Sequence, residues 1–390
     1  LFFSFAITTA VVYFVSSKVI KIEKLLAVGL LIVAVGLIVL FVLLAIIKLY
    51  YNKSFVFPSN YNQIFHYWYI IISFTLISFN SLILSFFQGI SNFKIINFIT
   101  ILNGCLNFIV FGACYVLYKY EYSGINVNNI LLISMCLVVV NFVIHLFLFF
   151  KFFSVWPDFK LNFKEDIRPV LVFISLGHLA YMVSFITYRI DYWVVEHYNG
   201  VEELGYYAQA VGMGQMFWYV STPISTVLAP FLTAEHSKDS INTFKFFSRI
   251  NFSLTFCLLF ITCLFASYIF PIYGSQFCNS VLSFRIISFG ILMASVSKVL
   301  AVYFISKNKI IYNLIASTTG MVVAVILDFS LIPIYGKIGA SIATSISYLA
   351  ITIVVVIYLK SKFDFDLRNI LIVTKDDILI VKSKIYNLLN

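Results

Sequence analysis

Long apolar stretches separated by short polar segments run along almost the whole chain. A helix that crosses the roughly 30 Å hydrocarbon core of a bilayer needs about 20 consecutive apolar residues. Applied along the sequence, this criterion predicts eleven membrane-spanning helices and therefore an all-α, polytopic membrane protein. The predicted spans lie near residues 1–17, 25–47, 67–88, 95–117, 129–150, 169–195, 206–232, 250–270, 280–304, 310–332 and 338–359.

The composition leads to the same class of protein. Hydrophobic residues make up 62% of the 390 residues, charged residues only 11%, and the mean hydropathy is +1.01. A soluble domain carries roughly a quarter charged residues, so this chain has too few to cover itself with a water-compatible surface. The six cysteines form no CxxC pair. We interpret them as small core hydrophobes, not as a disulfide or metal framework.

Lysine and arginine are distributed unequally between the two sets of alternate loops. One set, together with the start of the C-terminal tail, holds fifteen of them, and the opposite set holds four. Because positively charged loops stay in the cytoplasm, the first set is predicted to be cytoplasmic, with the C-terminus inside and Leu1 at the outer face. The net charge of +10 is then a signal of topology, and we do not interpret it as nucleic-acid binding.

Two stretches match without gaps at an offset of 215 residues. GISNFKIIN (89–97) aligns with FISKNKIIY (304–312), and in the same register Tyr120 aligns with Tyr335. Six spans separate the two stretches, as expected for two parallel lobes related by an axis along the membrane normal. The alternative is that the match reflects only the shared composition of membrane helices.

The repeat predicts the domain organisation. We expect an N-terminal lobe of five spans over 1–151, a cytoplasmic linker over 152–168, a C-terminal lobe of six spans over 169–359 and a cytoplasmic tail over 360–390. The seventh span aligns with the first, so the intact architecture is expected to have twelve spans, the first of which is missing here.

Five charged residues fall at membrane depth, where each costs at least ~2.5 kcal/mol and usually faces a bundle interior or an aqueous cavity. They are Arg189, Asp191, Arg285, Lys298 and Asp328. His178 joins them as a titratable residue. His178 and Arg189 are eleven residues apart and are predicted to share one helix face, whereas the spacing of Arg189 and Asp191 disfavours an ion pair within one helix.

We assign provisional roles to these residues from their charge. The candidates for substrate binding are Arg189, His178, Lys298 and Arg285, because a mildly cationic interior suits an anionic passenger. Asp191 and Asp328 are the candidates for ion coupling. The alternatives are that the bases snorkel to the membrane interface and that the acids form structural salt bridges between the lobes.

Two further features complete the pattern. Pro223 and Pro230 interrupt the seventh span and are candidate hinges for alternating access, with a static kink as the alternative.

The tail 363–390 is too charged to span a membrane. It is predicted to form an amphipathic helix on the inner leaflet, with its basic residues on anionic lipid. Those residues are Arg368, Lys375, Lys382 and Lys384.

The stretch RIDYWVVEHYNGVEELGYYAQAVGMGQMFWYVSTPISTVLAPF (189–231) resembles the seventh and eighth helices of the polysaccharide-unit flippases of the MOP transporter superfamily. Those helices show an Arg/Asp-bearing segment, a short external loop and then a G-Y-Y-x-x-A motif that opens a helix ending near a proline. The matching residues are Arg189, Asp191, Gly205, Tyr206, Tyr207, Ala208 and Pro230. KNKIIYNLIAS (307–317) and YGKIGASIATSISY (335–348) resemble later helices of the same family.

This resemblance implies a MATE-like transporter of two helix bundles that moves undecaprenyl-diphosphate-linked oligosaccharides from the inner to the outer leaflet of the bacterial cytoplasmic membrane. It implies no enzyme activity and no cofactor, but coupling to H⁺ or Na⁺. It also implies the lipid-linked oligosaccharide and membrane lipids as partners, with a polysaccharide polymerase and a chain-length regulator as further ones. Arg189 is the residue expected to contact the diphosphate or an acidic sugar.

Other functions remain open from the sequence. Within the superfamily, a drug/cation antiporter or a lipid II flippase is the nearest rival, but an antiporter for cationic drugs is expected to carry more interior acids than bases. A membrane polymerase or acyltransferase needs acids, histidines or arginines gathered at one membrane face, often on a sizeable loop. The predicted external loops contain no arginine, which argues against such an enzyme.

Overall fold

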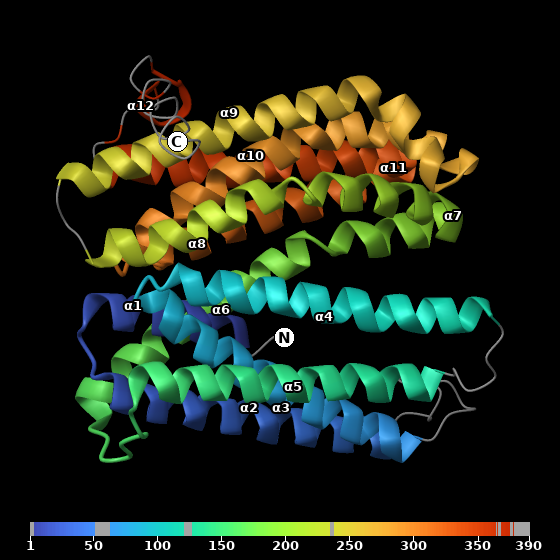
Figure 1. Ribbon diagram of the computed structural model, residues 1–390. Helices are drawn as coiled ribbons and strands as arrows, with labels where there is room; N and C mark the ends of the chain where they lie inside the picture. Colours follow the sequence, from blue (N-terminus) through green and yellow to red (C-terminus); the bar gives the residue numbers. More distant parts are fainter. Residues whose placement is uncertain are drawn as a thin grey trace, which may run out of the picture. The chain divides into compact units, whose positions relative to one another are not determined.

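The computed structural model describes residues 4–50, 63–120, 127–234, 238–363, 365, 368–374 and 377 (Figure 1). Over these ranges the chain is helical and contains no strand, which confirms the predicted fold class. By its contacts the chain divides into two compact units, 1–175 and 176–390. The boundary between them falls inside one helix, α6.

The N-terminal unit consists of five helices followed by a short π-helical turn. They are α1 (Ser4–Ser17), α2 (Ile22–Tyr50), α3 (Gln63–Gly89), α4 (Phe93–Lys119), α5 (Val127–Phe153) and η1 (Phe163–Ile167). Helix α3 packs against α1, α2 and α5 and is the centre of this unit. Helix α6 (Arg168–Thr187) then leads into the second unit.

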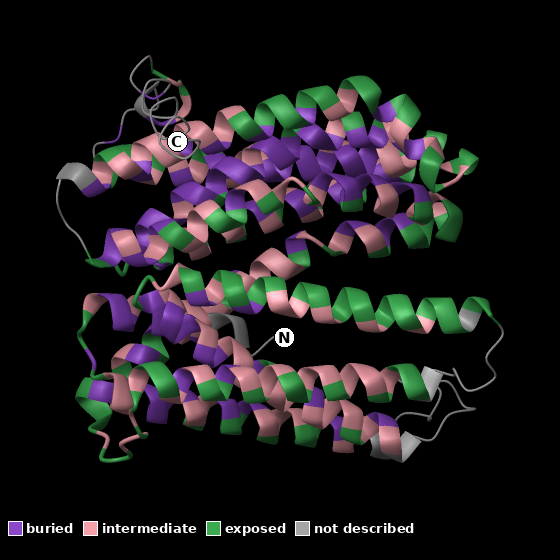
Figure 2. Cartoon of the chain, in the orientation of Figure 1, coloured by how far each residue is buried: buried purple, intermediate pink, exposed green. Residues whose placement is uncertain are grey.

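The C-terminal unit has its core around α10. Its remaining helices are α7 (Ile190–Gln215), α8 (Trp218–Ala234), α9 (Lys238–Ile269), η2 (Phe270–Tyr273), η3 (Ser275–Ser280), α10 (Val281–Ser306), α11 (Ile311–Phe363) and α12 (Arg368–Leu371). Helix α10 packs against α7, α8, α9 and α11, and buried residues concentrate along it (Figure 2). The small residue Gly290 permits this packing, because a Cβ there would lie 2.6 Å from the Cα of Ser345.

Within the described residues, eight helical stretches are long and apolar enough to cross a membrane, and Ile7–Ser17 is a shorter apolar helix. Two of the eight, Phe163–Gln215 and Ile311–Phe363, contain 53 residues each. At 1.5 Å per residue, a straight helix of that length would be about 80 Å long, more than twice the hydrocarbon thickness. Each reverses at a glycine with positive φ, Gly200 (φ 83°) and Gly336 (φ 55°), so each makes two passes. The chain is a multi-pass membrane protein, and each of the eleven predicted spans overlaps one of these eight stretches or the shorter helix Ile7–Ser17.

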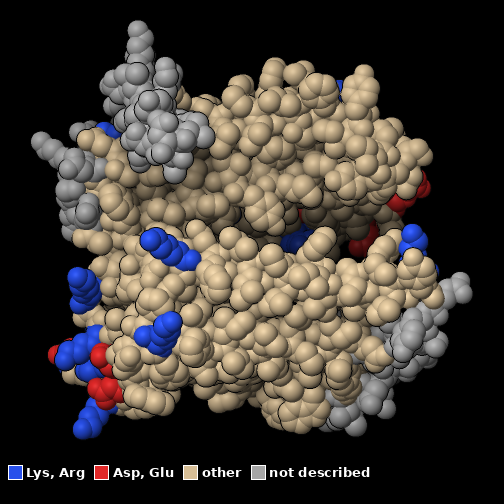
Figure 3. Space-filling model, in the orientation of Figure 1, with Lys and Arg blue, Asp and Glu red and all other residues tan. Residues whose placement is uncertain are grey.

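Basic side chains gather at one end of each unit, which we call the basic end. In the N-terminal unit it lies where α1 meets α2 and α5 meets η1, and Figure 3 shows a concentration of Lys and Arg there beside a lateral surface of uncharged residues. In the C-terminal unit it lies where α9 begins and α10 ends, and it includes Lys245, Lys307 and Lys309. The cytoplasmic orientation of these ends stays a prediction.

Two of the predicted spans are interrupted at unexpected places. The sixth breaks at Tyr188–Arg189, between α6 and α7, and the backbone of Arg189 is not helical (φ −133°, ψ −20°). The prediction that His178 and Arg189 share a face of one continuous helix is therefore wrong. The seventh breaks at Met216–Phe217, between α7 and α8, and not at a proline.

Candidate functional site: two buried carboxylates in the C-terminal unit

Asp191 lies inside the C-terminal unit, in the first turn of α7, and is 2% exposed. Its Oδ2 accepts a 2.5 Å hydrogen bond from the hydroxyl of Tyr207 and a 3.3 Å hydrogen bond from that of Thr344. Its Oδ1 accepts from the backbone N–H of Tyr192 at 2.9 Å. The tyrosine and threonine hydroxyls are themselves 2.9 Å apart. Asp191 is thus held by three donors from two elements, α7 and α11.

Asp328 is the second carboxylate of the site. It lies on α11, is 1% exposed, and its Oδ1 is buried without a hydrogen-bond partner. It is close enough to Asp191 for the two carboxylates to interact electrostatically. Neither acid forms an ion pair among the described residues. A buried, unpaired polar atom costs about 1–3 kcal/mol, so the oxygen of Asp328 is suited to a proton or a cation.

The turns at the two glycines place both acids at the same depth. In the first hairpin, Asp191 lies nine residues before Gly200 and Tyr207 lies seven residues after it. In the second, Asp328 lies eight residues before Gly336 and Thr344 lies eight residues after it. At 1.5 Å per residue, each of these side chains lies roughly 12 Å from its turn. Each helical hairpin therefore carries an acid on its incoming helix and a hydroxyl on its outgoing helix.

The tips of these two hairpins are also joined to each other. Lys337, next to Gly336, forms a 2.7 Å ion pair with Glu203 and lies over the ring of Tyr206 at 4.9 Å. A Cβ at Gly336 would lie 3.3 Å from Nδ2 of Asn199. These contacts fix the register of α7 against α11, and with it the position of Asp191 relative to Asp328.

Aromatic residues enclose the site on the side toward α8. The ring of Tyr348, which is 2% exposed, packs edge-on against Tyr188 at 5.6 Å, and Tyr188 lies 5.4 Å from the ring of Trp218. Tyr192 packs edge-on against Tyr207 at 5.6 Å. These rings exclude water and lower the local dielectric, which strengthens every electrostatic interaction of the two acids.

Arg189 does not share this enclosure. It is an exposed residue of its unit, its guanidinium lies over the ring of Tyr192 at 5.1 Å, and it forms no ion pair with Asp191. The absence of this ion pair agrees with the spacing argument from the sequence. Arg189 still acts on Asp191 through space, because only Ile190 separates them along the chain.

The other predicted substrate-binding residues are dispersed. Lys298 is exposed, donates a 2.9 Å hydrogen bond to Oγ1 of Thr222 and lies 5.3 Å over the ring of Trp218. Arg285 donates to the carbonyl oxygen of Cys263 at 3.2 Å and to the hydroxyl of Ser267 at 3.3 Å, both on α9. Arg285 and Lys298 are thirteen positions apart on α10, about 20 Å along the helix, so they do not bind one small group together.

The positions of His178, Pro223 and Pro230 do not indicate a role for these residues. His178 is half-buried in α6. Pro223 is exposed and Pro230 buried, and both lie inside the continuous helix α8. The hinge role of the prolines and the substrate contact of His178 stay predictions.

The sequence singled out both acids of the site and named Tyr207 only as part of the G-Y-Y-x-x-A motif, without a role, and it missed Thr344 and Tyr348. Tyrosine and threonine are common in membrane helices and cost little there, so neither residue type stands out. The available signal was the similar spacing of an acid and a hydroxyl about each glycine turn, seven to nine residues on either side. That signal is readable only once the helices are known to reverse at Gly200 and Gly336.

Comparison with known proteins gives the fold a precedent. No family model matches the sequence, and no curated protein matches it either. Among solved structures, the chain is similar to an outward-facing multidrug resistance MATE family transporter of the MOP superfamily, with TM-score 0.71, 13% identity and coverage of 93% of this chain and 85% of that one. The fold is therefore that of the MATE-like transporters.

Two other solved structures have the same fold. The MATE transporter ClbM in complex with Rb⁺ aligns with TM-score 0.72 and 13% identity, over 94% of this chain and 83% of that one. A MOP superfamily transporter from Pyrococcus furiosus aligns with TM-score 0.72 and 14% identity, over 93% and 85%. For that protein, a binding pocket of reversed polarity is described as suggesting a different function.

Proposed function

We propose that this chain is an ion-coupled membrane transporter that moves an anionic, lipid-linked oligosaccharide from the inner to the outer leaflet of a bacterial cytoplasmic membrane. The fold of the MATE-like transporters supports transport as the general activity. The observation that carries the coupling is the enclosed pair Asp191 and Asp328, which are 2% and 1% exposed and form no ion pair within the described chain.

The physical case for coupling rests on charge. Two carboxylates close together in a low-dielectric interior are not both stable as anions without a compensating positive charge. A proton or a monovalent cation supplies that charge when bound. The oxygens available to hold it are those of the two carboxylates and of the hydroxyls that hydrogen-bond Asp191, namely Tyr207 and Thr344. The neighbour ClbM was solved with Rb⁺, which supports a cation in such a fold.

Tyr207 and Thr344 link the charge state of the acids to helix position. They join Asp191 on α7 to α11 through hydrogen bonds that are strongest when the carboxylate is ionised. Neutralising Asp191 weakens these bonds and loosens the contact between the two hairpins. Transport by alternating access requires such a change in helix contacts when the ion binds or leaves.

The substrate class follows from where the bases lie. Arg189 and Lys298 are exposed in their unit and have no carboxylate partner among the described residues, whereas both acids are enclosed. The groups available to a passenger are thus positive, as a diphosphate or an acidic sugar requires. The resemblance of residues 189–231 to polysaccharide-unit flippases supports the same substrate.

A MATE-type drug or cation antiporter is the second candidate function. The neighbour that is a multidrug resistance transporter favours it, as does the unpartnered oxygen of Asp328, which suits a cationic passenger. A lipid II flippase shares the anionic substrate chemistry and is a variant of the first proposal. Export of a surface glycan separates the flippases from the antiporter.

The proposed function is tested by complementation. A strain that lacks this gene should lose surface polysaccharide, and the wild-type gene should restore it. Arg189→Ala should fail to restore the polymer although the protein reaches the membrane in normal amounts. The matched control is Glu196→Gln, which removes an exposed charge from α7, the helix that begins directly after Arg189, and should restore export. Normal export with Arg189→Ala would remove this residue from the transport path.

A further inference from the structure

The chain that follows the last membrane helix of the C-terminal unit folds back onto the basic end of that unit. Residues 368–371 form the short helix α12, which packs against α9. Phe365 and Ile370 are 4% and 1% exposed. An amphipathic helix on the membrane surface, as the sequence predicts for 363–390, keeps its apolar face for lipid, but here the protein itself covers these two side chains.

The apolar part of this contact joins the ends of three helices. The ring of Phe365 lies 5.6 Å from that of Phe244 on α9 and 4.9 Å from that of Tyr303 on α10. Phe363, at the end of α11, packs edge-on against the same tyrosine at 5.0 Å. The tail thus inserts into the place where α9 begins and α10 and α11 end.

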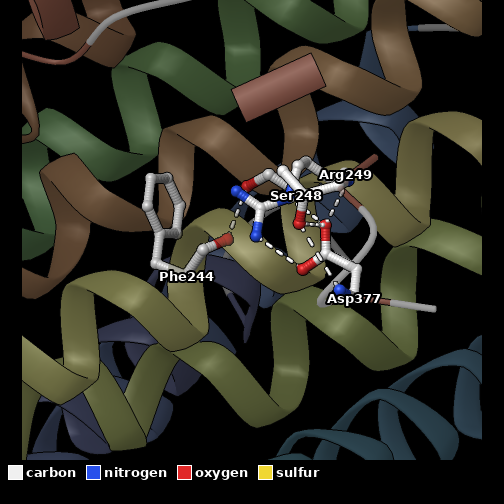
Figure 4. Close-up of polar contacts among 5 residues, drawn as sticks. Phe244, Ser248, Arg249 and Asp377 are labelled. Carbon is white, nitrogen blue, oxygen red and sulfur yellow. Dashed lines mark hydrogen bonds and ion pairs between the residues drawn. The ribbon is translucent and has the colours of Figure 1, made fainter. Parts of the chain in front are cut away.

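The polar part is a bidentate ion pair between Arg249 and Asp377 (Figure 4). Nε and Nη2 of Arg249 donate to the two carboxylate oxygens at 2.7 and 2.6 Å. The backbone N–H and the hydroxyl of Thr374 each donate to Oδ2 at 2.8 Å. The side chains of the pair are 12% and 2% exposed. A pair this enclosed and this fully hydrogen-bonded is specific, and removal of one partner leaves a buried charge.

The N-terminal unit has a contact of the same kind. After α5, the chain returns to the start of α2, where the backbone N–H of Asp158 donates to the carbonyl oxygen of Glu23 at 3.1 Å. Nζ of Lys24 then forms a 2.7 Å ion pair with Asp166, whose carboxylate also accepts from the backbone N–H of Asn162 at 2.8 Å. The side chain of Asp166 is 8% exposed.

These two contacts are equivalent in the repeat. At the offset of 215 residues, α2 aligns with α9, and α5 aligns with the part of α11 after Gly336. In each unit, the segment after the last helix contributes a buried aspartate to a basic residue on the equivalent helix. The bases differ in position, since Lys24 is two residues after the start of α2 and Arg249 eleven after the start of α9. The arrangement recurs although the residues do not align.

We propose that the segment after the last helix of each unit is an acidic latch that ties the basic ends of that unit's helices into one body. The C-terminal latch consists of the described residues 365, 368–374 and 377 and closes through Asp377 and Arg249. The N-terminal latch closes through Asp166 and Lys24. Each unit is thereby prevented from splaying at its basic end. This inference goes beyond the proposed transport activity and does not depend on it.

Hydrogen–deuterium exchange of the purified full chain in lipid nanodiscs tests the C-terminal latch. In the wild type, amides of the peptide that contains 365–377 should exchange slowly. Asp377→Asn should raise their exchange roughly tenfold or more, because one partner of a buried pair is lost, while amides of α10 stay protected. The charge-swapped double variant Arg249→Asp with Asp377→Arg should restore protection. The control Lys360→Ala removes a nearby exposed charge and should change nothing.

Further arms distinguish a latch from a lipid-bound tail. Asp166→Asn should raise exchange in 154–167 and leave 365–377 unchanged, since each latch belongs to its own unit. Protection of 365–377 should be the same in anionic and in zwitterionic nanodiscs. Protection that follows anionic lipid content and ignores Asp377→Asn would overturn the latch and restore the membrane-surface tail. Because no arm measures transport, this outcome is independent of the proposed function.

Discussion

At the scale of single residues, burial separates the acids of the C-terminal unit from its bases. Asp191 and Asp328 are enclosed, whereas Arg189, Lys298 and Arg285 are exposed in their unit. The cost of burying a carboxylate is met at Asp191 by three hydrogen bonds, and at Asp328 one oxygen remains unpartnered. If an ion binds as we propose, Asp328 is expected to be the more sensitive reporter of its binding, because one of its oxygens has no partner.

Tyr207→Phe tests the hydrogen bonding of Asp191. The change removes a donor to a buried carboxylate and should lower the free energy of unfolding by about 1.5–3 kcal/mol, measured by thermal unfolding in detergent. Tyr206→Phe is the matched control. The neighbouring tyrosine bonds Glu202, an exposed residue, at 2.6 Å, so its loss should cost less than about 1 kcal/mol. Equal losses for the two variants would contradict the description of the site.

Asp377 gives the latch a defined pH dependence. Burial raises the pKa of its carboxyl, but hydrogen bonds from Arg249 and Thr374 outweigh burial and hold the pKa below its ordinary value. A carboxyl with a lowered pKa in the folded state stabilises the protein at neutral pH, and this stability is lost as the pH falls through that value. The difference in Tm between wild type and Asp377→Asn should persist from neutral pH to about pH 4 and vanish only below it. A difference that vanishes near pH 6 would contradict the ion pair.

At the scale of elements, the two hairpins that reverse at Gly200 and Gly336 position the site. Their tips are held together by Lys337 and Glu203, and the packing of α10 against α11 fixes them to the core. That packing depends on the absence of a side chain at Gly290, where an added Cβ would meet the backbone of Ser345.

Gly290→Ala should therefore destabilise the C-terminal unit. Backbone atoms move less readily than side-chain ends, so the overpacking should cost about 1–3 kcal/mol and lower Tm. Gly212→Ala is the control. An added Cβ at Gly212 meets nothing within 4 Å, and alanine favours a helix over glycine by up to about 1 kcal/mol. A Gly290→Ala protein as stable as the control would show that α10 and α11 pack less closely than described.

At this scale, the sequence predicted the spans but missed the breaks inside them. Apolar length was sufficient to predict the spans, and the cost of burying charge was sufficient to identify Asp191 and Asp328. The breaks at Arg189 and at Met216–Phe217 were missed because a window of apolar residues is insensitive to a change of direction inside a span. Asp377 was missed because the charged tail averages to a polar segment, and only tertiary contacts show that this one carboxylate is buried.

At the scale of the whole molecule, the predicted repeat relates the two latches that we propose, one at the basic end of each unit. The fold of the chain is shared with MATE-like transporters. The predicted lobe boundaries at 151 and 169, and the expectation of a twelfth span, stay predictions.

The central claim is that Asp191 and Asp328 couple an ion to the movement of an anionic lipid-linked oligosaccharide. The most direct test is flipping of that substrate in proteoliposomes, with and without an imposed H⁺ or Na⁺ gradient, for the wild type and Asp328→Asn. We predict that one of the two gradients accelerates flipping by the wild type several-fold and that Asp328→Asn abolishes this response. A variant whose flipping responds to the gradient as the wild type does would contradict the account.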